Sequence, residues 1–184
     1  MNETATQTVQ FTRLSVRYDA GQDRLRVDAV DPTGATCALW LTRRLAGGLL
    51  PALANWLEKA SPAAAAVPQA VREQAVALES AVIAGRRARD PAPAVPPQAV
   101  PRLVTTIDLS RQGPRWSLVF KADADALHAQ PLQGQLNCDS GTVHSLVQGL
   151  VQQVKKAQWN DALALGWLAE GAEPPKPAPG TLLN

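Results

Sequence analysis

The segment Cys37–Ala60, CALWLTRRLAGGLLPALANWLEKA, decides the fold of this chain, because a strand pattern in it runs directly into a helix pattern. Residues 35–41 are a short, mainly apolar run that follows a turn sequence, which is typical of a strand. Thr42 is a residue type that caps helix starts, and a helix is predicted over residues 42–60. Its apolar side chains recur at helical spacing and form one stripe: Leu49, Leu50, Leu53 and Leu57.

Three residues inside this helix disfavour helical structure. Gly47 and Gly48 each cost roughly 1 kcal/mol relative to alanine, and Pro51 removes a backbone hydrogen bond and crowds the preceding turn. Either the helix begins late, at Pro51, or it begins at Thr42 and bends near Pro51. A close approach of the helix to another element would explain the small residues.

Two alternating runs precede the segment, at residues 14–18 and 24–30. The turn sequences AGQD (20–23) and DPTG (31–34) separate the three predicted strands. Residues 9–60 are therefore predicted to form an antiparallel meander of three strands followed by a helix. The strand side chains expected to face the helices are Leu14, Val16, Tyr18, Leu25, Val27, Ala29, Cys37, Leu39 and Leu41.

The same order recurs in the second half of the chain. Alternating runs at 102–110, 115–121 and 132–138 predict three more strands, and a helix is predicted over 139–159. Two sets of side chains are each expected to share one face of their strand: Leu103, Thr105, Ile107 and Leu109 in the first run, and Trp116, Leu118 and Phe120 in the second.

A shift of 97 positions aligns the two helices without a gap: Thr42 falls on Asp139, Leu53 on Leu150, and Lys59-Ala60 on Lys156-Ala157. The alignment favours a helix start at Thr42, because Asp139 is also a capping residue. It predicts an internal duplication, and the alternative is two unrelated meander-plus-helix units. The predicted fold is α+β: two β-β-β-α units whose meanders form one sheet or two facing sheets, with the helices packed on one side.

Residues 61–101 connect the two units. The second unit is assigned to residues 102–168, and residues 169–184 are a Pro-rich tail that is expected to be disordered. A helix is predicted over 68–89, followed by a Pro-rich connection at 90–101. This helix would bridge the units or supply a homodimer contact. Its apolar stripe, which would either join the core or form that contact, consists of Val71, Ala75, Leu78 and Val82.

Composition excludes several classes of protein. The net charge of +2 gives no global attraction for polyanions, although 13 Arg stand against 5 Lys. Two Cys provide neither a disulfide framework nor a metal cluster. The N-terminus lacks the features of a signal peptide, and no apolar run approaches ~18 residues. We expect a cytoplasmic protein with no membrane contact, no cofactor and no metal.

The most reactive set of side chains is Cys138, Asp139, Ser140 and His144, near the start of the second helix. A cysteine at a helix N-terminus can have a lowered pKa. The simpler interpretation has Asp139 as the helix cap, Cys138 at the end of a buried strand and His144 on the helix surface. We therefore expect no catalytic residue.

Basic residues gather on the sheet face that points away from the helices. An aromatic ring among arginines is the kind of surface that holds phosphates while a base stacks. The alternative is a solvated face on which Asp28 and Asp108 supply ion-pair partners. The residues of this predicted binding face are Arg13, Arg17, Arg24, Arg26 and Trp40 in the first unit, and Arg115 and Lys121 in the second.

The repeated sheet-plus-helix order over residues 9–60 and 102–159 is similar to that of the Whirly and PUR families of single-stranded nucleic-acid binders. Each repeat of those families presents a curved sheet backed by a helix, but has four strands where three are predicted here. The resemblance implies a nucleic-acid-binding sheet face. Because the chain is nearly neutral, we rank first a non-catalytic interaction or assembly module that binds another protein, and second a single-stranded nucleic-acid binder.

Overall fold

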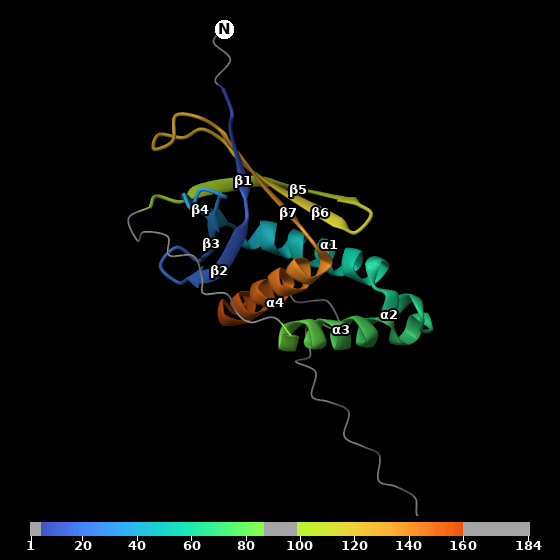
Figure 1. Cartoon of the computed structure of the whole chain (residues 1–184). Helices are drawn as coiled ribbons and strands as arrows, with labels where there is room; N and C mark the ends of the chain where they lie inside the picture. Colours follow the sequence, from blue (N-terminus) through green and yellow to red (C-terminus); the bar gives the residue numbers. More distant parts are fainter. Residues whose placement is uncertain (1–4, 87–98, 160–184) are drawn as a thin grey trace, which may run out of the picture.

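The structure is a computed structural model that describes residues 5–86 and 99–159 (Figure 1). It is a mixed α+β protein, as predicted. Its elements in chain order are β1 (Gln7–Phe11), β2 (Arg13–Asp19), β3 (Arg24–Val30), β4 (Thr36–Leu41), α1 (Arg43–Ala60), α2 (Pro62–Ala65), the short 3-10 helix η1 (Gln69–Val71), α3 (Arg72–Arg86), β5 (Arg102–Gln112), β6 (Arg115–Ala122), β7 (Leu132–Cys138) and α4 (Ser140–Lys156).

The strands form one sheet of seven, in the order β1-β7-β6-β5-β4-β3-β2. Within each predicted unit the neighbouring strands pair antiparallel, β2 with β3 with β4 and β5 with β6 with β7. The two units join through a short parallel pairing of β4 with β5. The two antiparallel meanders are thus confirmed, and they belong to a single sheet.

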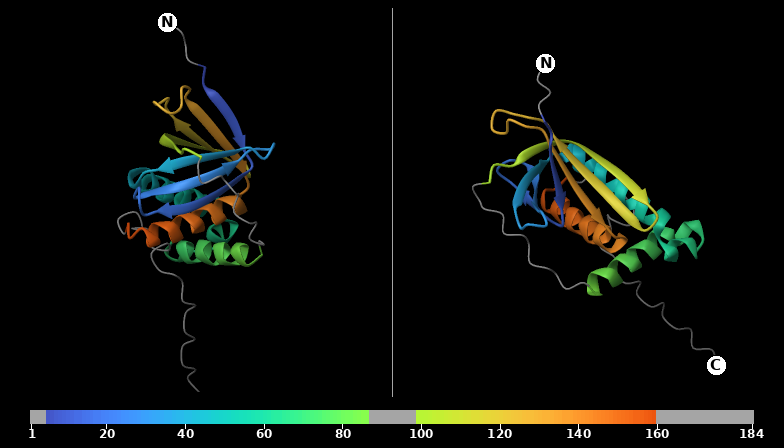
Figure 2. Two further views of the ribbon diagram at one scale, coloured as in Figure 1. Left: turned by 90° about the vertical axis from the view of Figure 1, so that its left-hand side faces the viewer. Right: turned by 45° about the horizontal axis from the view of Figure 1, so that its top comes forward.

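Strand β1 was not predicted. Only Thr12 separates it from β2, yet β1 pairs in parallel with β7 at one end of the strand order and β2 pairs with β3 at the other. Because residues 7–19 are one continuous stretch, the two ends of the order meet at Thr12 and the sheet must curve around. Figure 2 shows β2–β4 crossing the remaining strands at a steep angle.

Two threonines lie at points where the regular strand pairing is interrupted. Thr12 Oγ1 donates to Val30 O at 3.0 Å, and Thr105 Oγ1 donates to Lys121 O at 3.3 Å. Thr105 lies where the β5–β6 register shifts. This bulge corrects the expected face at the start of β5, because a one-residue insertion reverses which side chains point inward: Val104 is buried and Leu103 is exposed. Beyond the bulge, Ile107 and Leu109 pack against the core.

The order β-β-β-α therefore occurs twice, with matching registers. Val27 pairs with Leu39 in the first unit as Leu118 pairs with Leu136 in the second. Thr42 caps α1 and Asp139 caps α4 through their side-chain oxygens, as predicted. Duplication as the origin of this arrangement stays a prediction.

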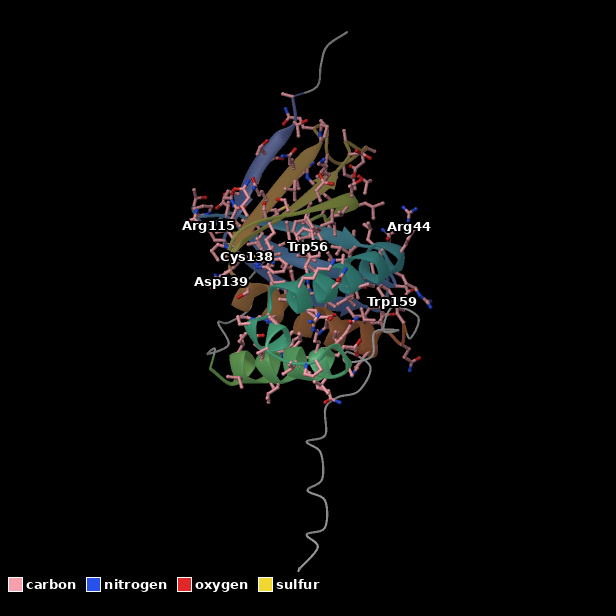
Figure 3. All side chains as sticks on the ribbon, turned by 90° about the vertical axis from the view of Figure 1, so that its right-hand side faces the viewer. Arg44, Trp56, Arg115, Cys138, Asp139 and Trp159 are labelled. Atoms are coloured by element: carbon pink, nitrogen blue, oxygen red, sulfur yellow. The ribbon has the colours of Figure 1, made fainter. Side chains whose placement is uncertain are left out.

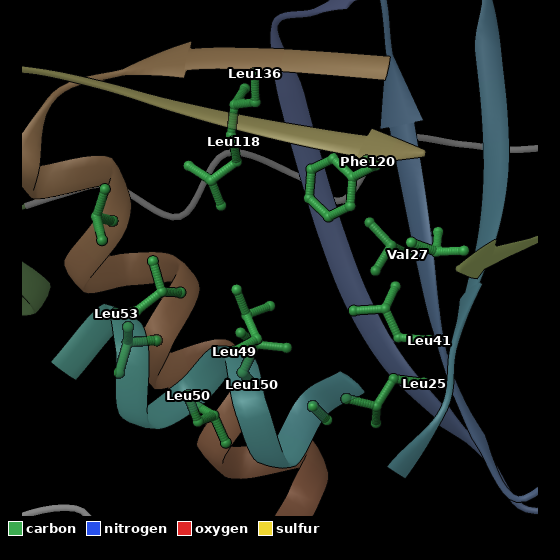
Figure 4. Packing of buried hydrophobic residues seen from close by; sticks show 14 of the residues in the cluster. Leu25, Val27, Leu41, Leu49, Leu50, Leu53, Leu118, Phe120, Leu136 and Leu150 are labelled. Carbon is green, nitrogen blue, oxygen red and sulfur yellow. The ribbon is translucent and has the colours of Figure 1, made fainter. Parts of the chain in front are cut away.

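The core lies between the concave sheet face and the two long helices (Figure 4). Each fully buried leucine or phenylalanine contributes about 1.5–3 kcal/mol relative to an exposed one. The expected strand parity is confirmed in β3, β4 and β6. Buried residues that meet there include Leu25, Val27, Leu41, Leu118, Phe120 and Leu136 from the sheet, and Leu49, Leu50, Leu53 and Leu150 from the helices.

Helix α1 begins after Thr42 and continues through Pro51, so the late-start interpretation is wrong. The close-approach explanation fails at Gly48, because no atom of another element lies within 4 Å of the position that a Cβ would take there. Ser61 ends α1 and caps the short helix α2, which was not predicted.

Helix α3 begins at Arg72 and not at the predicted residue 68, because residues 69–71 form the 3-10 turn η1. The predicted end of the helix, residues 87–89, lies outside the described residues. It contacts α1, α2 and α4, and forms an outer layer on the side of the helices away from the sheet (Figures 1 and 2). Most of the Pro-rich connection and the tail at 169–184 lie outside the described residues.

Candidate interaction surfaces

The inner face of α3 is held by polar contacts as well as by apolar packing. Val76 is buried, and Ser80, one turn further on, is 4% exposed. Ser80 Oγ lies 2.6 Å from His144 Nδ1, and Gln148 Nε2 donates to Ser80 O at 3.0 Å. His144 and Gln148 lie one turn apart on α4, so these contacts fix how α3 is rotated about its own axis.

A second polar contact ties α3 to the junction of α1 and α2. The Ser61 hydroxyl donates to the Glu79 carboxylate and accepts from Ala64 N at 3.0 Å. Ser61 is itself buried. The residues between α1 and α3 are therefore anchored to the helix that follows them.

His144 is 2% exposed, which corrects its expected place on the helix surface. Burial lowers the pKa of its imidazole, and the nearby Glu79 carboxylate acts in the opposite direction. Ser80 and His144 are the residue types of a nucleophile–base pair, but both are closed off from solvent. Asp139 caps α4 as predicted, and Cys138 is half-buried at the end of β7.

The outer face of α3, together with Val71 at the end of η1, is apolar and exposed. Leu78 is 68% exposed, Val82 44% and Val71 38%, and Ala75 is half-buried. The predicted stripe therefore does not join the core. Its residues are spaced by 4, 3 and 4 positions, which is the heptad spacing of residues that form a seam between two helices. We call Val71, Ala75, Leu78 and Val82 the α3 stripe.

The residues of the predicted binding face point away from the helices, as expected, but the two arginines at its centre pair with a carboxylate. Arg17, Arg26 and Trp40 lie side by side across β2, β3 and β4, on the convex face. Arg26 is only 5% exposed, and its Nε lies 2.7 Å from Asp28 Oδ1. Arg17 Nε lies 3.4 Å from Asp28 Oδ2. The buried Asp28 carboxylate is thus an ion-pair partner for both arginines, and Arg26 differs from the expectation of an accessible residue.

The other residues of that face are spread out. Arg13 is exposed and Arg24 is half-buried, on the two ends of the β2–β3 hairpin. Lys121 Nζ lies 2.6 Å from Asp108 Oδ2, and both are solvent-exposed. Arg115 lies at the opposite end of β6, near Cys138 and Asp139 (Figure 3). Only Arg17, Arg26 and Trp40 form a neighbouring group.

A cavity of about 260 Å³ opens at the end of the curved sheet where β1 and β4 begin. Cys37 and Arg102 line it. Burial raises the pKa of the Cys37 thiol, with the Arg102 charge acting in the opposite direction. Arg102 donates to Gln130 O at 2.6 Å and to Gln7 Oε1 at 3.0 Å, so its guanidinium joins β5 to the neighbouring loop and strand.

Within residues 5–86 and 99–159, no cluster of three or more His, Cys, Asp or Glu side chains could hold a metal ion. None of the helices in this part of the chain combines the length and apolarity needed to cross a membrane. Comparisons with protein-family models, with curated proteins and with solved structures found no match.

Proposed function

We propose that this chain is a non-catalytic interaction or assembly module of the cytoplasm that binds another protein through the α3 stripe. One observation supports the proposal: three branched apolar side chains, two on one face of α3 and Val71 directly before that helix, are exposed to solvent, with Leu78 68% exposed. Contiguous exposed apolar surface on a folded protein usually marks a binding site. The partner surface would be an amphipathic helix, since heptad-spaced residues fit between the side chains of a facing helix.

The opposite face of α3 supports this assignment. If the helix lay loosely on the core, it could rotate and bury Leu78 in place of Ser80. The Ser80–His144 contact and the Gln148 hydrogen bond oppose that rotation, because it would leave buried polar groups without partners. The stripe is thus held in an outward position, where no other described residue of the chain covers it.

The proposal is tested by photo-crosslinking from the stripe. A benzoylphenylalanine at position 78 of the full chain is compared with one at position 110, because Ser110 is exposed on the convex face of β5. We expect position 78 to give an adduct of defined mass that Val82→Glu removes. Equal labelling from positions 78 and 110, or an adduct that survives Val82→Glu, would contradict the proposal.

Single-stranded nucleic acid is the second candidate, supported by the row of Arg17, Arg26 and Trp40 on the convex face. It ranks lower because Asp28 pairs with both arginines. Fluorescence anisotropy of a labelled oligonucleotide at low and moderate salt tests it, since phosphate contacts weaken steeply with salt. Arg13→Ala with Trp40→Ala is the appropriate variant, because Arg26→Ala would leave Asp28 short of a buried ion-pair partner.

A further inference from the structure

We infer that the partner of the α3 stripe is a second copy of this chain, bound with the two α3 helices antiparallel. The inference rests on the proposed function and names its partner. A twofold axis passing between Ala75 and Leu78 would place the stripe of one copy on the stripe of the other. The two stripes would then bury each other along the length of the helix.

The sizes of the stripe residues fit this arrangement. Antiparallel pairing places Leu78 opposite Ala75 of the second copy, and Val71 opposite Val82 of the second copy. Every layer then combines a large with a small side chain or two of middle size, which allows even packing. Parallel pairing would instead place Leu78 on Leu78 and Ala75 on Ala75, so that one layer is crowded and the next is nearly empty.

The charges beside the stripe fit as well. Arg72 follows Val71 and Glu79 follows Leu78, so both flank the stripe on the same side. In an antiparallel dimer the side of the helix that carries these two residues faces the same side of the second copy, which brings Arg72 near Glu79 of the second copy. The Glu79 carboxylate accepts from Ser61 within its own copy and has further acceptor sites for a guanidinium. Arg72 Nε is buried and has no hydrogen-bond partner among the described residues. Because Nε is closed off from solvent, a carboxylate across the seam would pair with the terminal nitrogens of this guanidinium.

The experiment measures mass in solution by light scattering over a range of concentrations, with the full chain. The expected mass of the unmodified protein is twice the 19.5 kDa of one chain, and Leu78→Glu should reduce it to one chain. Two matched double variants then test the orientation: Val71→Glu with Val82→Lys, called the Glu/Lys variant, and Val71→Glu with Val82→Glu, called the Glu/Glu variant. Both alter only exposed positions.

Antiparallel pairing sets the new glutamate at position 71 of the Glu/Lys variant against the new lysine at position 82 of its mate. In the Glu/Glu variant the same positions set glutamate against glutamate. The Glu/Lys variant should therefore dimerise at least about tenfold more tightly than the Glu/Glu variant. Equal dimerisation of the two variants, a monomeric unmodified protein, or a dimer that Leu78→Glu leaves intact would overturn the inference. A stripe-dependent adduct at position 78 to a different protein would also overturn it, while leaving the proposed function in place.

Discussion

Ser80 Oγ on α3 and His144 Nδ1 on α4 lie 2.6 Å apart, and both side chains are buried. Their contact joins two helices across 64 residues of sequence. Since Leu78 is only two positions from Ser80, the two side chains must point to different sides of the helix. The buried polar pair thus determines which face of α3 meets solvent.

The first prediction concerns the strength of this contact. Ser80→Ala leaves the buried His144 Nδ1 without its partner, and we expect a loss of about 1–3 kcal/mol in the free energy of unfolding. Leu78→Ala, at an exposed position on the same helix, is the control and should change it by less than about 0.5 kcal/mol when measured on monomer at low concentration. Urea denaturation provides both values. Equal effects would show that the contact does not stabilise the fold.

The second prediction concerns pH. Burial holds the pKa of His144 below its ordinary value of 6.5, so below that pH the unfolded chain binds more protons than the folded one. The contribution of neutral, buried His144 to the free energy of unfolding is complete above pH 6.5. It declines as the pH falls from there to the pKa that His144 has in the folded protein. We expect His144→Asn, whose amide can still meet Ser80, to lose this part of the pH dependence. Urea midpoints between about pH 7.5 and about pH 5 compare the two proteins, and parallel curves would refute the prediction.

The third prediction concerns the two threonines at which the regular strand pairing is interrupted. Thr12→Val removes a partly buried hydrogen bond to Val30 O, and we expect the free energy of unfolding to fall by about 1 kcal/mol. Thr105→Val should cost less, because water can reach the equivalent carbonyl of Lys121. The neighbouring exposed Thr106 is the control. A Thr12→Val protein as stable as Thr106→Val would mean that the hydroxyl does not stabilise this crossing point.

The fourth prediction concerns the packing of β1 on β7. A Cβ on Gly134 would lie 2.2 Å from Phe11 Cε2, and the Phe11 ring is buried. Gly134→Ala should therefore destabilise the protein by about 1–3 kcal/mol, and Phe11→Leu should restore part of the loss. Gly149→Ala is the matched control, because no atom lies within 4 Å of its Cβ and it lies inside α4. For Gly149→Ala we expect the free energy of unfolding to rise by up to about 1 kcal/mol. Thermal unfolding that ranks the two alanine variants alike would contradict this account.

The sequence predicted the elements whose patterns are local. Strand alternation placed Val27 and Leu39 in the core, and the capping residues Thr42 and Asp139 placed the helix starts. Strand β1 was missed because its partner β7 is distant in the chain, with Gln10 and its contact Gln135 separated by 125 positions. A signal was present: the apolar positions change parity from Phe11 to Leu14, which indicates an extra residue at Thr12.

The two candidate surfaces were less predictable. Periodicity predicted that the residues of the α3 stripe are neighbours along one side of the helix. It does not predict whether that side meets the core or solvent. The inner face of α3 is marked mainly by Val76 and Ser80, and a serine gives no apolar signal. On the sheet, parity placed Arg26 on the convex face, but the burial of its ion pair with Asp28 depends on tertiary contacts.

The most direct measurement is the rate at which a thiol at position 78 reacts with an alkylating reagent. Leu78→Cys is compared with Leu127→Cys, with Cys37 and Cys138 replaced by alanine in both. The two leucines are 68% and 73% exposed in the isolated chain, so their intrinsic access is matched. We predict that the thiol at 78 reacts more slowly than that at 127 in intact cells and in concentrated protein, and that dilution removes the difference. Equal rates under all these conditions would show that no partner covers the stripe.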